Sequence, residues 1–209
     1  MKNKIIFSSA LLLISSLSNA DDIKPIIGLD LGFEGGTITT DYSAPGYIPA
    51  SYEHDYSGAN FRLSGGIEIE HESLQSRIKA FYESASGEVE FDSSLAISDE
   101  DYDSTEYGLS YDLIIPQEEG VEPFFGVEIG VGSSEFDIPN ADETDYISFG
   151  LYAGLLYSIN DNIDLSARLG YKSRSYEDYS EYAPLLGAVV TEEVEYSGLD
   201  LKVGLTYMF

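Results

Sequence analysis

Apolar and polar side chains alternate along most of this 209-residue sequence. A period of two places successive side chains on opposite faces of an extended chain and predicts β-strands. The pattern recurs in eight segments. Each is longer than the roughly five or six residues of an ordinary strand and reaches the ~9–11 residues that cross a bilayer at a tilt. The segments span residues 26–38, 58–70, 75–91, 104–115, 122–136, 145–159, 163–177 and 194–209.

One parity of these segments is apolar, from Ile27 and Leu29 in the first to Tyr207 and Phe209 in the last. The other parity carries glycine and charge. Its charged residues are nine acids and seven bases, namely Asp30, Glu34, Glu68, Glu70, Glu83, Glu106, Asp112, Glu128 and Asp200, and Arg62, Arg77, Lys79, Arg168, Lys172, Arg174 and Lys202.

The bases on this second parity are unexpected in so acidic a chain. Two of the 10 Lys and Arg residues, Lys2 and Lys4, precede residue 21, so the remaining 8 face 38 Asp and Glu, a formal charge of −30. A solvated face of such a chain is expected to be as acidic as the rest, yet every one of these bases except Lys24 lies on it. Because unpaired buried charges are costly, the near balance predicts a closed interior.

An apolar outer face and a charged interior invert a soluble barrel such as a lipocalin. Only hydrocarbon stabilises an outward apolar band, and only a closed barrel satisfies its backbone there. Eight strands also form a barrel whose interior side chains just fill it. The sequence therefore predicts an all-β fold, an eight-stranded antiparallel up-and-down transmembrane β-barrel, over residues 21–209.

Residues 1–20 are predicted to be a secretory signal peptide. Lys2 and Lys4 give a positive start, an apolar stretch follows, and "SNA" before Asp21 suits cleavage. The alternative, a transmembrane anchor, is disfavoured because the apolar run is too short to span a bilayer comfortably. No cysteine is present to brace the exported chain, and its acidity excludes nucleic acid as a partner.

The joins between the segments alternate in length. "HESL", "PQEEGV" and "NDN" are short, whereas the joins over 39–57, 92–103, 137–144 and 178–193 are long. Short turns at one end and long loops at the other are typical of outer-membrane barrels, whose short turns face the periplasm. The sequence thus predicts four long, acidic, tyrosine-bearing loops on the outside of a bacterial cell.

The last nine residues, "LKVGLTYMF", combine Lys202, Gly204, Tyr207 and Phe209 in a pattern that resembles the C-terminal signal of bacterial outer-membrane β-barrels. Residues 21–209 as a whole are similar to the small eight-stranded family that includes the outer-membrane protein A barrel and its adhesin-like relatives. The resemblance implies that the barrel-assembly machinery recognises the last strand and pairs it with the first. It also implies a location among outer-membrane lipids and lipopolysaccharide.

Closure of the last strand against the first predicts a buried ionic cluster at the seam. Arg168 and Lys202 lie on the inward parity of neighbouring segments, and Asp200 lies two residues from Lys202 on the same face. Asp30 of the first segment is expected close by, across the seam. The predicted cluster fills the lumen and fixes the register of the strands.

The sequence offers little for catalysis, and we expect neither an enzyme nor a cofactor. His71, Glu72 and Ser73 combine a base, an acid and a hydroxyl. Adjacent residues on a tight turn, however, seldom converge as nucleophile, base and orienting group. His54 is expected to lie in an exposed loop.

A metal site is equally weak. Asp99, Asp101 and Asp103 offer carboxylate oxygens to Ca²⁺ or Mg²⁺ within one predicted loop. Their spacing does not match an EF-hand loop, so a solvated acidic loop is expected.

These features favour a structural or surface-interaction role, of an adhesin-like kind, carried by the acidic loops. Two alternatives stay open. A small cation-leaning channel is one, because glycine-rich interior strands could leave room and interior acids outnumber bases. An outer-membrane lipid-modifying enzyme is the other, although no strand-borne His-x-Ser pair matches one.

The terminal aromatic residue provides a first test. Deleting Phe209 is expected to reduce insertion into the membrane, because the residue completes the predicted assembly signal without reaching the interior. The measurements are the membrane-inserted amount and heat-modifiable migration. Normal values for both would show that the tail is not an assembly signal.

Overall fold

The computed structural model describes residues 22–70, 74–90, 100–117, 120–136, 144–177, 179–184 and 188–209. The predicted signal peptide over residues 1–20 lies outside this part of the chain. No helix among the described residues is long and apolar enough to cross a bilayer. The strands are β1 (Asp22–Ser43), β2 (Ala50–Glu70), β3 (Gln75–Glu90), β4 (Glu100–Ile114), β5 (Val121–Phe136), β6 (Thr144–Asn160), β7 (Ile163–Tyr176), β8 (Tyr179–Ala183) and β9 (Ala188–Met208).

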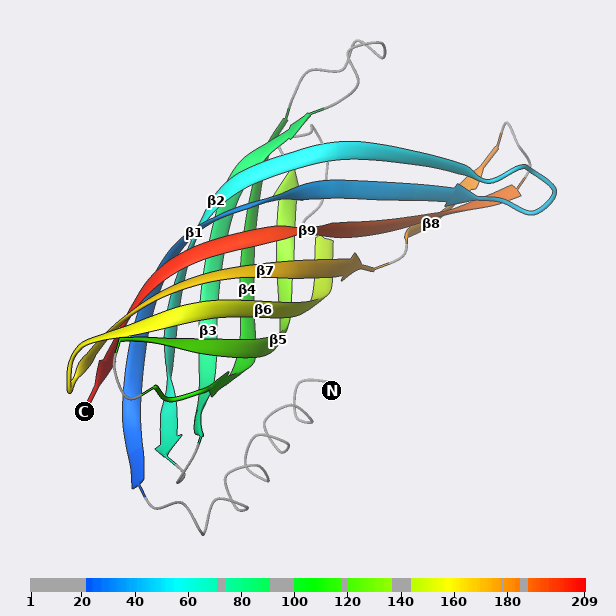
Figure 1. The fold of residues 1–209 in the computed structure, drawn as a ribbon. Helices are drawn as coiled ribbons and strands as arrows, with labels where there is room; N and C mark the ends of the chain where they lie inside the picture. The colour runs from blue at the N-terminus through cyan, green and yellow to red at the C-terminus, as the bar shows by residue number, and fades with distance from the viewer. Residues whose placement is uncertain are drawn as a thin grey trace.

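The strands form one sheet that closes on itself (Figure 1). Each strand from β1 to β6 pairs antiparallel with the next, β7 pairs with β9, and β9 pairs back onto β1. β8 is attached to β9 outside this ring. The ring therefore holds eight strands, and the predicted eight-stranded antiparallel up-and-down barrel is confirmed.

The register of the strands places apolar residues opposite one another on the outer face. Leu29 lies opposite Leu63 on one side and Leu205 on the other, and these three side chains are 44%, 50% and 49% exposed. Because the ring pairs its backbone groups internally, such a band is suited to hydrocarbon. The predicted outer face is confirmed. Ile69 is an exception, because it has the apolar parity of the segment over 58–70 but is buried.

Aromatic side chains gather near both ends of this band. At the short-turn end, the rings of Tyr207 and Phe209 pack edge to face with their centroids 5.0 Å apart. Toward the other end, Phe61, Tyr82 and Tyr107 of three neighbouring strands follow one another at 6.1 and 5.1 Å. Two aromatic girdles are expected of a barrel in an outer membrane.

The prediction of a long loop over residues 39–57 is wrong. β1 continues to Ser43 and β2 begins at Ala50, and the two strands stay paired to their ends. Only residues 44–49 connect them, with Gly46 at a φ of 85° in the turn. The prediction ended the strands where the apolar alternation stops, but β-favouring Thr and Tyr residues continue a sheet that no longer has to match hydrocarbon.

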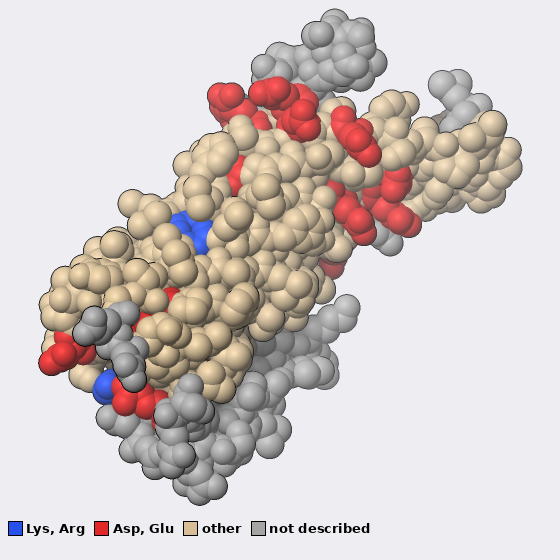
Figure 2. Space-filling model, in the orientation of Figure 1, with Lys and Arg blue, Asp and Glu red and all other residues tan. Residues whose placement is uncertain are grey.

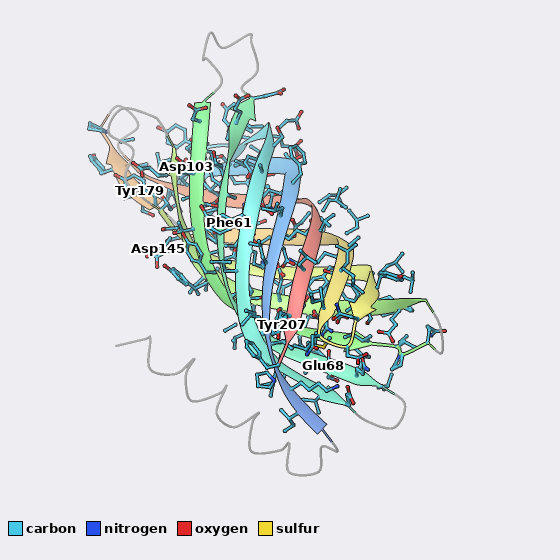
Figure 3. The ribbon with its side chains drawn as sticks, turned by 90° about the vertical axis from the view of Figure 1, so that its left-hand side faces the viewer. Phe61, Glu68, Asp103, Asp145, Tyr179 and Tyr207 are labelled. Carbon is cyan, nitrogen blue, oxygen red and sulfur yellow. The ribbon has the colours of Figure 1, made fainter. Side chains whose placement is uncertain are left out.

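The predicted loop over 178–193 also contains strands, β8 and the start of β9. Together with the outer parts of β1 and β2 they form a sheet that projects beyond the ring (Figure 1). We call residues 39–43, 50–54, 179–183 and 188–194 the protruding sheet. Figure 3 shows Tyr179, Asp103 and Asp145 at the opposite end of the molecule from Tyr207 and Glu68.

The remaining predicted joins are described only in part. The "NDN" turn is observed, with Asp161 and Asn162 between β6 and β7. Residues 71–73 of "HESL", 118–119 of "PQEEGV", 92–99 and 137–143 lie outside the described part of the chain.

Candidate functional site

Side chains fill the lumen, which is the candidate site. An apolar cluster near the short turns contains Ile114, Phe124, Tyr152 and Leu156. Charged side chains of the inward parity lie above and around it. A second apolar cluster lies toward the protruding sheet and consists of Ile38, Tyr56, Val89, Tyr102, Tyr146, Tyr176 and Tyr196.

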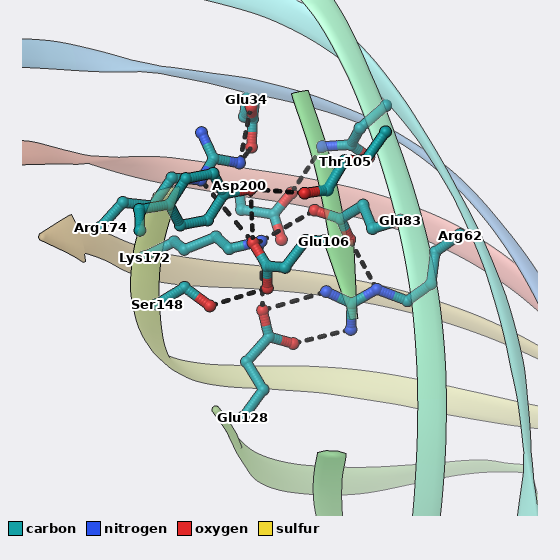
Figure 4. A network of polar contacts seen from close by, with 12 residues as sticks. Glu34, Arg62, Glu83, Thr105, Glu106, Glu128, Ser148, Lys172, Arg174 and Asp200 are labelled. Carbon is teal, nitrogen blue, oxygen red and sulfur yellow. Dashed lines mark hydrogen bonds and ion pairs between the residues drawn. The ribbon is translucent and has the colours of Figure 1, made fainter. Parts of the chain in front are cut away.

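Ten charged residues form one continuous network of ion pairs, most of which Figure 4 labels. The carboxylates are Glu34, Glu83, Glu106, Glu128 and Asp200, and the cations are Arg62, Arg168, Lys172, Arg174 and Lys202. None of the ten is more than 6% exposed. With five charges of each sign, the network buries no net charge, which lowers the cost of desolvating it.

Glu83 on β3 is the centre of this network. Its Oε2 lies 2.6 Å from Nε of Arg62 on β2 and 2.7 Å from Nζ of Lys202 on β9, while its Oε1 lies 2.8 Å from Nζ of Lys172 on β7. β3 is adjacent to neither β7 nor β9 in the sheet, so two of these contacts cross the lumen. One carboxylate thus connects four strands.

A bidentate contact and a bifurcated contact extend the network to the two sides of Glu83. Arg62 donates from Nη1 and Nη2 to the two oxygens of Glu128 at 2.7 and 3.0 Å. Nearer the protruding sheet, Arg174 donates from Nη2 to both oxygens of Glu34 at 3.0 and 2.8 Å. Nη1 of Arg174 also donates to the hydroxyl of Tyr102 at 3.0 Å. This bond joins the ionic network to the second apolar cluster, the one toward the protruding sheet.

Two smaller groups lie nearer the short turns. Arg77 pairs with Glu68 at 2.6 Å and also with Asp164, and Lys79 pairs with Asp112 at 2.6 Å. Each of the seven bases predicted to face inward therefore does so and is paired.

Sequence reasoning missed part of the lumen. It overlooked Asp164 and the inward tyrosines Tyr56, Tyr102, Tyr146, Tyr152, Tyr176 and Tyr196. All of these residues have the inward parity of their strands, so the period of two contains the signal that identifies them.

The predicted seam cluster is brought together only in part. Nζ of Lys202 lies 2.8 Å from Oδ2 of Asp200, and Nη2 of Arg168 lies 4.0 Å from the same oxygen. Asp30, by contrast, makes no ion pair within the described part of the chain.

The surroundings of Asp30 explain this difference. Its register partners are Arg62 on β2 and Gly204 on β9. The guanidinium of Arg62 is already held by Glu83 and Glu128, and glycine offers no side chain.

The C-terminal tail lies at the seam between β9 and β1. Lys202 and Gly204 face the lumen, whereas Tyr207 and Phe209 face outward and are 42% and 65% exposed. The backbone N–H of Phe209 donates to the carbonyl of Pro25 at 3.1 Å. This bond ties the last residue to the first strand.

The weak metal and catalytic candidates gain no support. Asp99 and His71 lie outside the described residues, and Asp101 and Asp103 lie on β4 with exposed side chains. Among the described residues, no group of three or more His, Asp or Glu side chains could hold a metal ion. The expectation that His54 lies in an exposed loop is wrong, because His54 is half-buried and lies on β2 in the protruding sheet.

The outside of the protein is acidic toward the protruding sheet. Figure 2 shows acidic side chains gathered at this end of the visible face, where little basic surface appears. Asp41 of β1 lies directly opposite Glu193 of β9 and Ser51 of β2. These residues line a hollow of about 320 Å³. Like charges placed directly opposite each other are unfavourable, so the hollow is suited to a positively charged group.

Tyrosines accompany these acids on the protruding sheet. The rings of Tyr42 and Tyr52 pack edge to face at 5.9 Å, and the hydroxyl of Tyr42 donates to Glu192 at 3.1 Å. Burial, followed by the charge of Glu192, raises the pKa of Tyr42 to about 12. Tyr42 therefore stays a neutral donor over the physiological pH range.

Comparison with solved structures places this chain among small bacterial outer-membrane barrels by fold. Neisserial surface protein A is 16% identical with a TM-score of 0.53, and the match covers 90% of this chain and 100% of that one. The outer-membrane protein OprG from Pseudomonas aeruginosa is 12% identical with a TM-score of 0.51, over 88% and 95% of the two chains. No protein-family model and no curated protein sequence matches the chain.

The ionic network predicts a specific loss of stability. Lys202→Met keeps most of the side-chain bulk but leaves Glu83 and Asp200 without one of their cations, at a cost of about 3–5 kcal/mol for a buried pair. Leu201→Met, on the outer face of the same strand, is the matched control and is expected to cost less than about 1.5 kcal/mol. Urea unfolding in lipid vesicles compares the two free energies. Equal losses would contradict a stabilising network.

Proposed function

We propose that this protein is a closed β-barrel of a bacterial outer membrane, with a structural or surface-interaction role carried by its protruding sheet. The filled lumen is the observation that supports closure. A cavity of about 20 Å³ lies between the ionic network and the apolar cluster near the short turns. It has room for about one water molecule. A lumen packed in this way braces the wall and blocks solutes.

The surface of the barrel supports the membrane location and limits the lipid contacts. Lys24, which pairs with Glu70 at 2.5 Å, is the one base of the described chain that lies outside the set of lumen cations. Lipopolysaccharide phosphates therefore meet no basic patch on this barrel. We propose that its lipid contacts are made chiefly by the outward apolar band, and that the barrel-assembly machinery inserts the chain through its C-terminal strand.

The alternative role as a small channel depended on room above the inward glycines. In the structure that room is occupied: a Cβ on Gly130 would meet Glu106 and Ser148, and one on Gly150 would meet Glu128. The other alternative, a lipid-modifying enzyme, needs a base near the lipid-facing band. The one described histidine, His54, lies beyond that band on the protruding sheet.

Recording from planar bilayers separates the closed barrel from the channel. The purified protein is expected to insert without discrete conductance steps, because the balanced network and both apolar clusters fill the pore. A general porin inserted in the same bilayer is the positive control. Reproducible cation-selective steps from this protein would contradict closure and make the channel the better explanation.

Surface interaction is tested through the acids of the protruding sheet. Asp41→Asn, Glu53→Gln and Glu193→Gln together are expected to weaken binding of a fluorescent octalysine peptide to intact cells. Exposed ion pairs are worth about 0.5 kcal/mol each, so losing three lowers affinity roughly tenfold.

The matched control removes the same charge elsewhere. Asp101→Asn, Asp103→Asn and Glu135→Gln neutralise three exposed acids on β4 and β5. This variant is expected to lose little binding. An equal loss in both variants would mean that net charge alone attracts the peptide.

A further inference from the structure

The small cavity in the lumen is lined by all eight strands of the ring. Its lining includes Asp30 of β1, Ser64 of β2, Lys79 of β3, Ser166 and Arg168 of β7, and Thr206 of β9. The cavity therefore lies inside the ring, toward its short-turn end, and touches the seam where β9 meets β1. Most of its lining is polar, including Arg77 of β3 and Asp112 of β4, and its apolar members are Ile114, Phe124 and Leu156.

Arg168 has unsatisfied hydrogen-bond donors beside this cavity. Its side chain is 6% exposed, and its Nε and Nη2 make no hydrogen bond to any described residue. Nη1 makes one long bond of 3.4 Å to Glu128, and the guanidinium lies over the ring of Tyr152 at 4.4 Å. Buried donors without an acceptor are costly, so this arrangement points to a further acceptor in the cavity.

Asp30 contributes a carboxylate to the lining of the same cavity. It makes no hydrogen bond or ion pair within the described ranges, and its side chain lies across Gly204, where an added Cβ would overlap Oδ1 of Asp30. The register sets Asp30 opposite Gly204. The absence of a side chain at position 204 therefore permits this position of the carboxylate.

We propose that the cavity is a binding site for one water molecule, which accepts a hydrogen bond from Arg168 and donates one to Asp30. The ligand must do both. A metal cation cannot accept from a guanidinium, and a simple anion such as chloride cannot donate to a carboxylate. Water does both, and a cavity of about 20 Å³ is large enough for one molecule.

This water connects the first strand to the seventh through the lumen, beside the seam that β9 closes. Asp30, which the sequence predicts to lie close to the seam cluster, is thus joined to its member Arg168 indirectly. Gly204 gains a role in the folded barrel that is separate from recognition of the tail during assembly.

Nuclear magnetic resonance of the protein in deuterated micelles tests the site. The side-chain Hε of Arg168, identified by its loss in Arg168→Lys, is expected to show a cross-peak to long-lived water. Replacing chloride with gluconate is expected to leave its chemical shift unchanged. A missing cross-peak in the wild type would overturn the proposal, and a shift that follows chloride would replace the water with an anion.

Variants at Asp30 and nearby distinguish the bound water from other exchangeable protons. Asp30→Leu removes the acceptor and occupies the space, so the cross-peak is expected to disappear. Asp30→Asn keeps an acceptor and Ser166→Ala removes a neighbouring hydroxyl, and both are expected to retain it. Gly65→Ala, where an added Cβ would meet only the carbonyl oxygen of Ile26 at 3.9 Å, is the control for substitution in the wall. Persistence in Asp30→Leu, or loss in Ser166→Ala, would contradict the assignment. If Asp30→Leu does not fold, the wild-type cross-peak decides the proposal alone.

Discussion

The contacts of Glu83 with three cations from three other strands are the interaction on which the barrel depends. Arg62, Lys172 and Lys202 reach this carboxylate from β2, β7 and β9, so it holds opposite walls of the ring at fixed positions. Each of these cations also pairs with a second acid. The complete network contains five positive and five negative charges. A lumen filled with partnered charge stays closed because taking away one member leaves its neighbours buried without compensation.

The placement of the cations in the lumen also determines the charge of the outer surface of the protein. Seven of the ten Lys and Arg residues face the lumen, and the acids of the protruding sheet have few bases near them. The acidic exterior is thus the counterpart of an interior that is close to neutral. It repels anionic surfaces and favours positively charged partners, which is why the surface role is proposed for the sheet rather than for the barrel wall.

The sequence predicts the strands, their two faces and the closure of β9 on β1, because each follows from a local period of two and from the need to pair every backbone group in hydrocarbon. It does not predict which inward residues meet. Parity shows that Glu83 and Lys172 face the lumen, but the stagger of the ring decides that they lie at the same height. For the same reason, the sequence does not show that Asp30 makes no direct ion pair with the other members of the seam cluster. The sequence does not predict the protruding sheet, because its strands lie outside the membrane and lack the alternating apolar face by which the strand ends are predicted.

The most direct test of the ionic lumen is a double-mutant cycle on Glu34 and Arg174, whose ion pair is the end of the network nearest the protruding sheet. Free energies of unfolding in lipid vesicles are measured for the wild type, Glu34→Gln, Arg174→Met and the double variant. Because both residues are buried and share hydrogen bonds, we predict a coupling energy of about 1.5–3 kcal/mol. Additive effects, with a coupling below about 0.5 kcal/mol, would contradict the claim that paired charges hold this barrel closed.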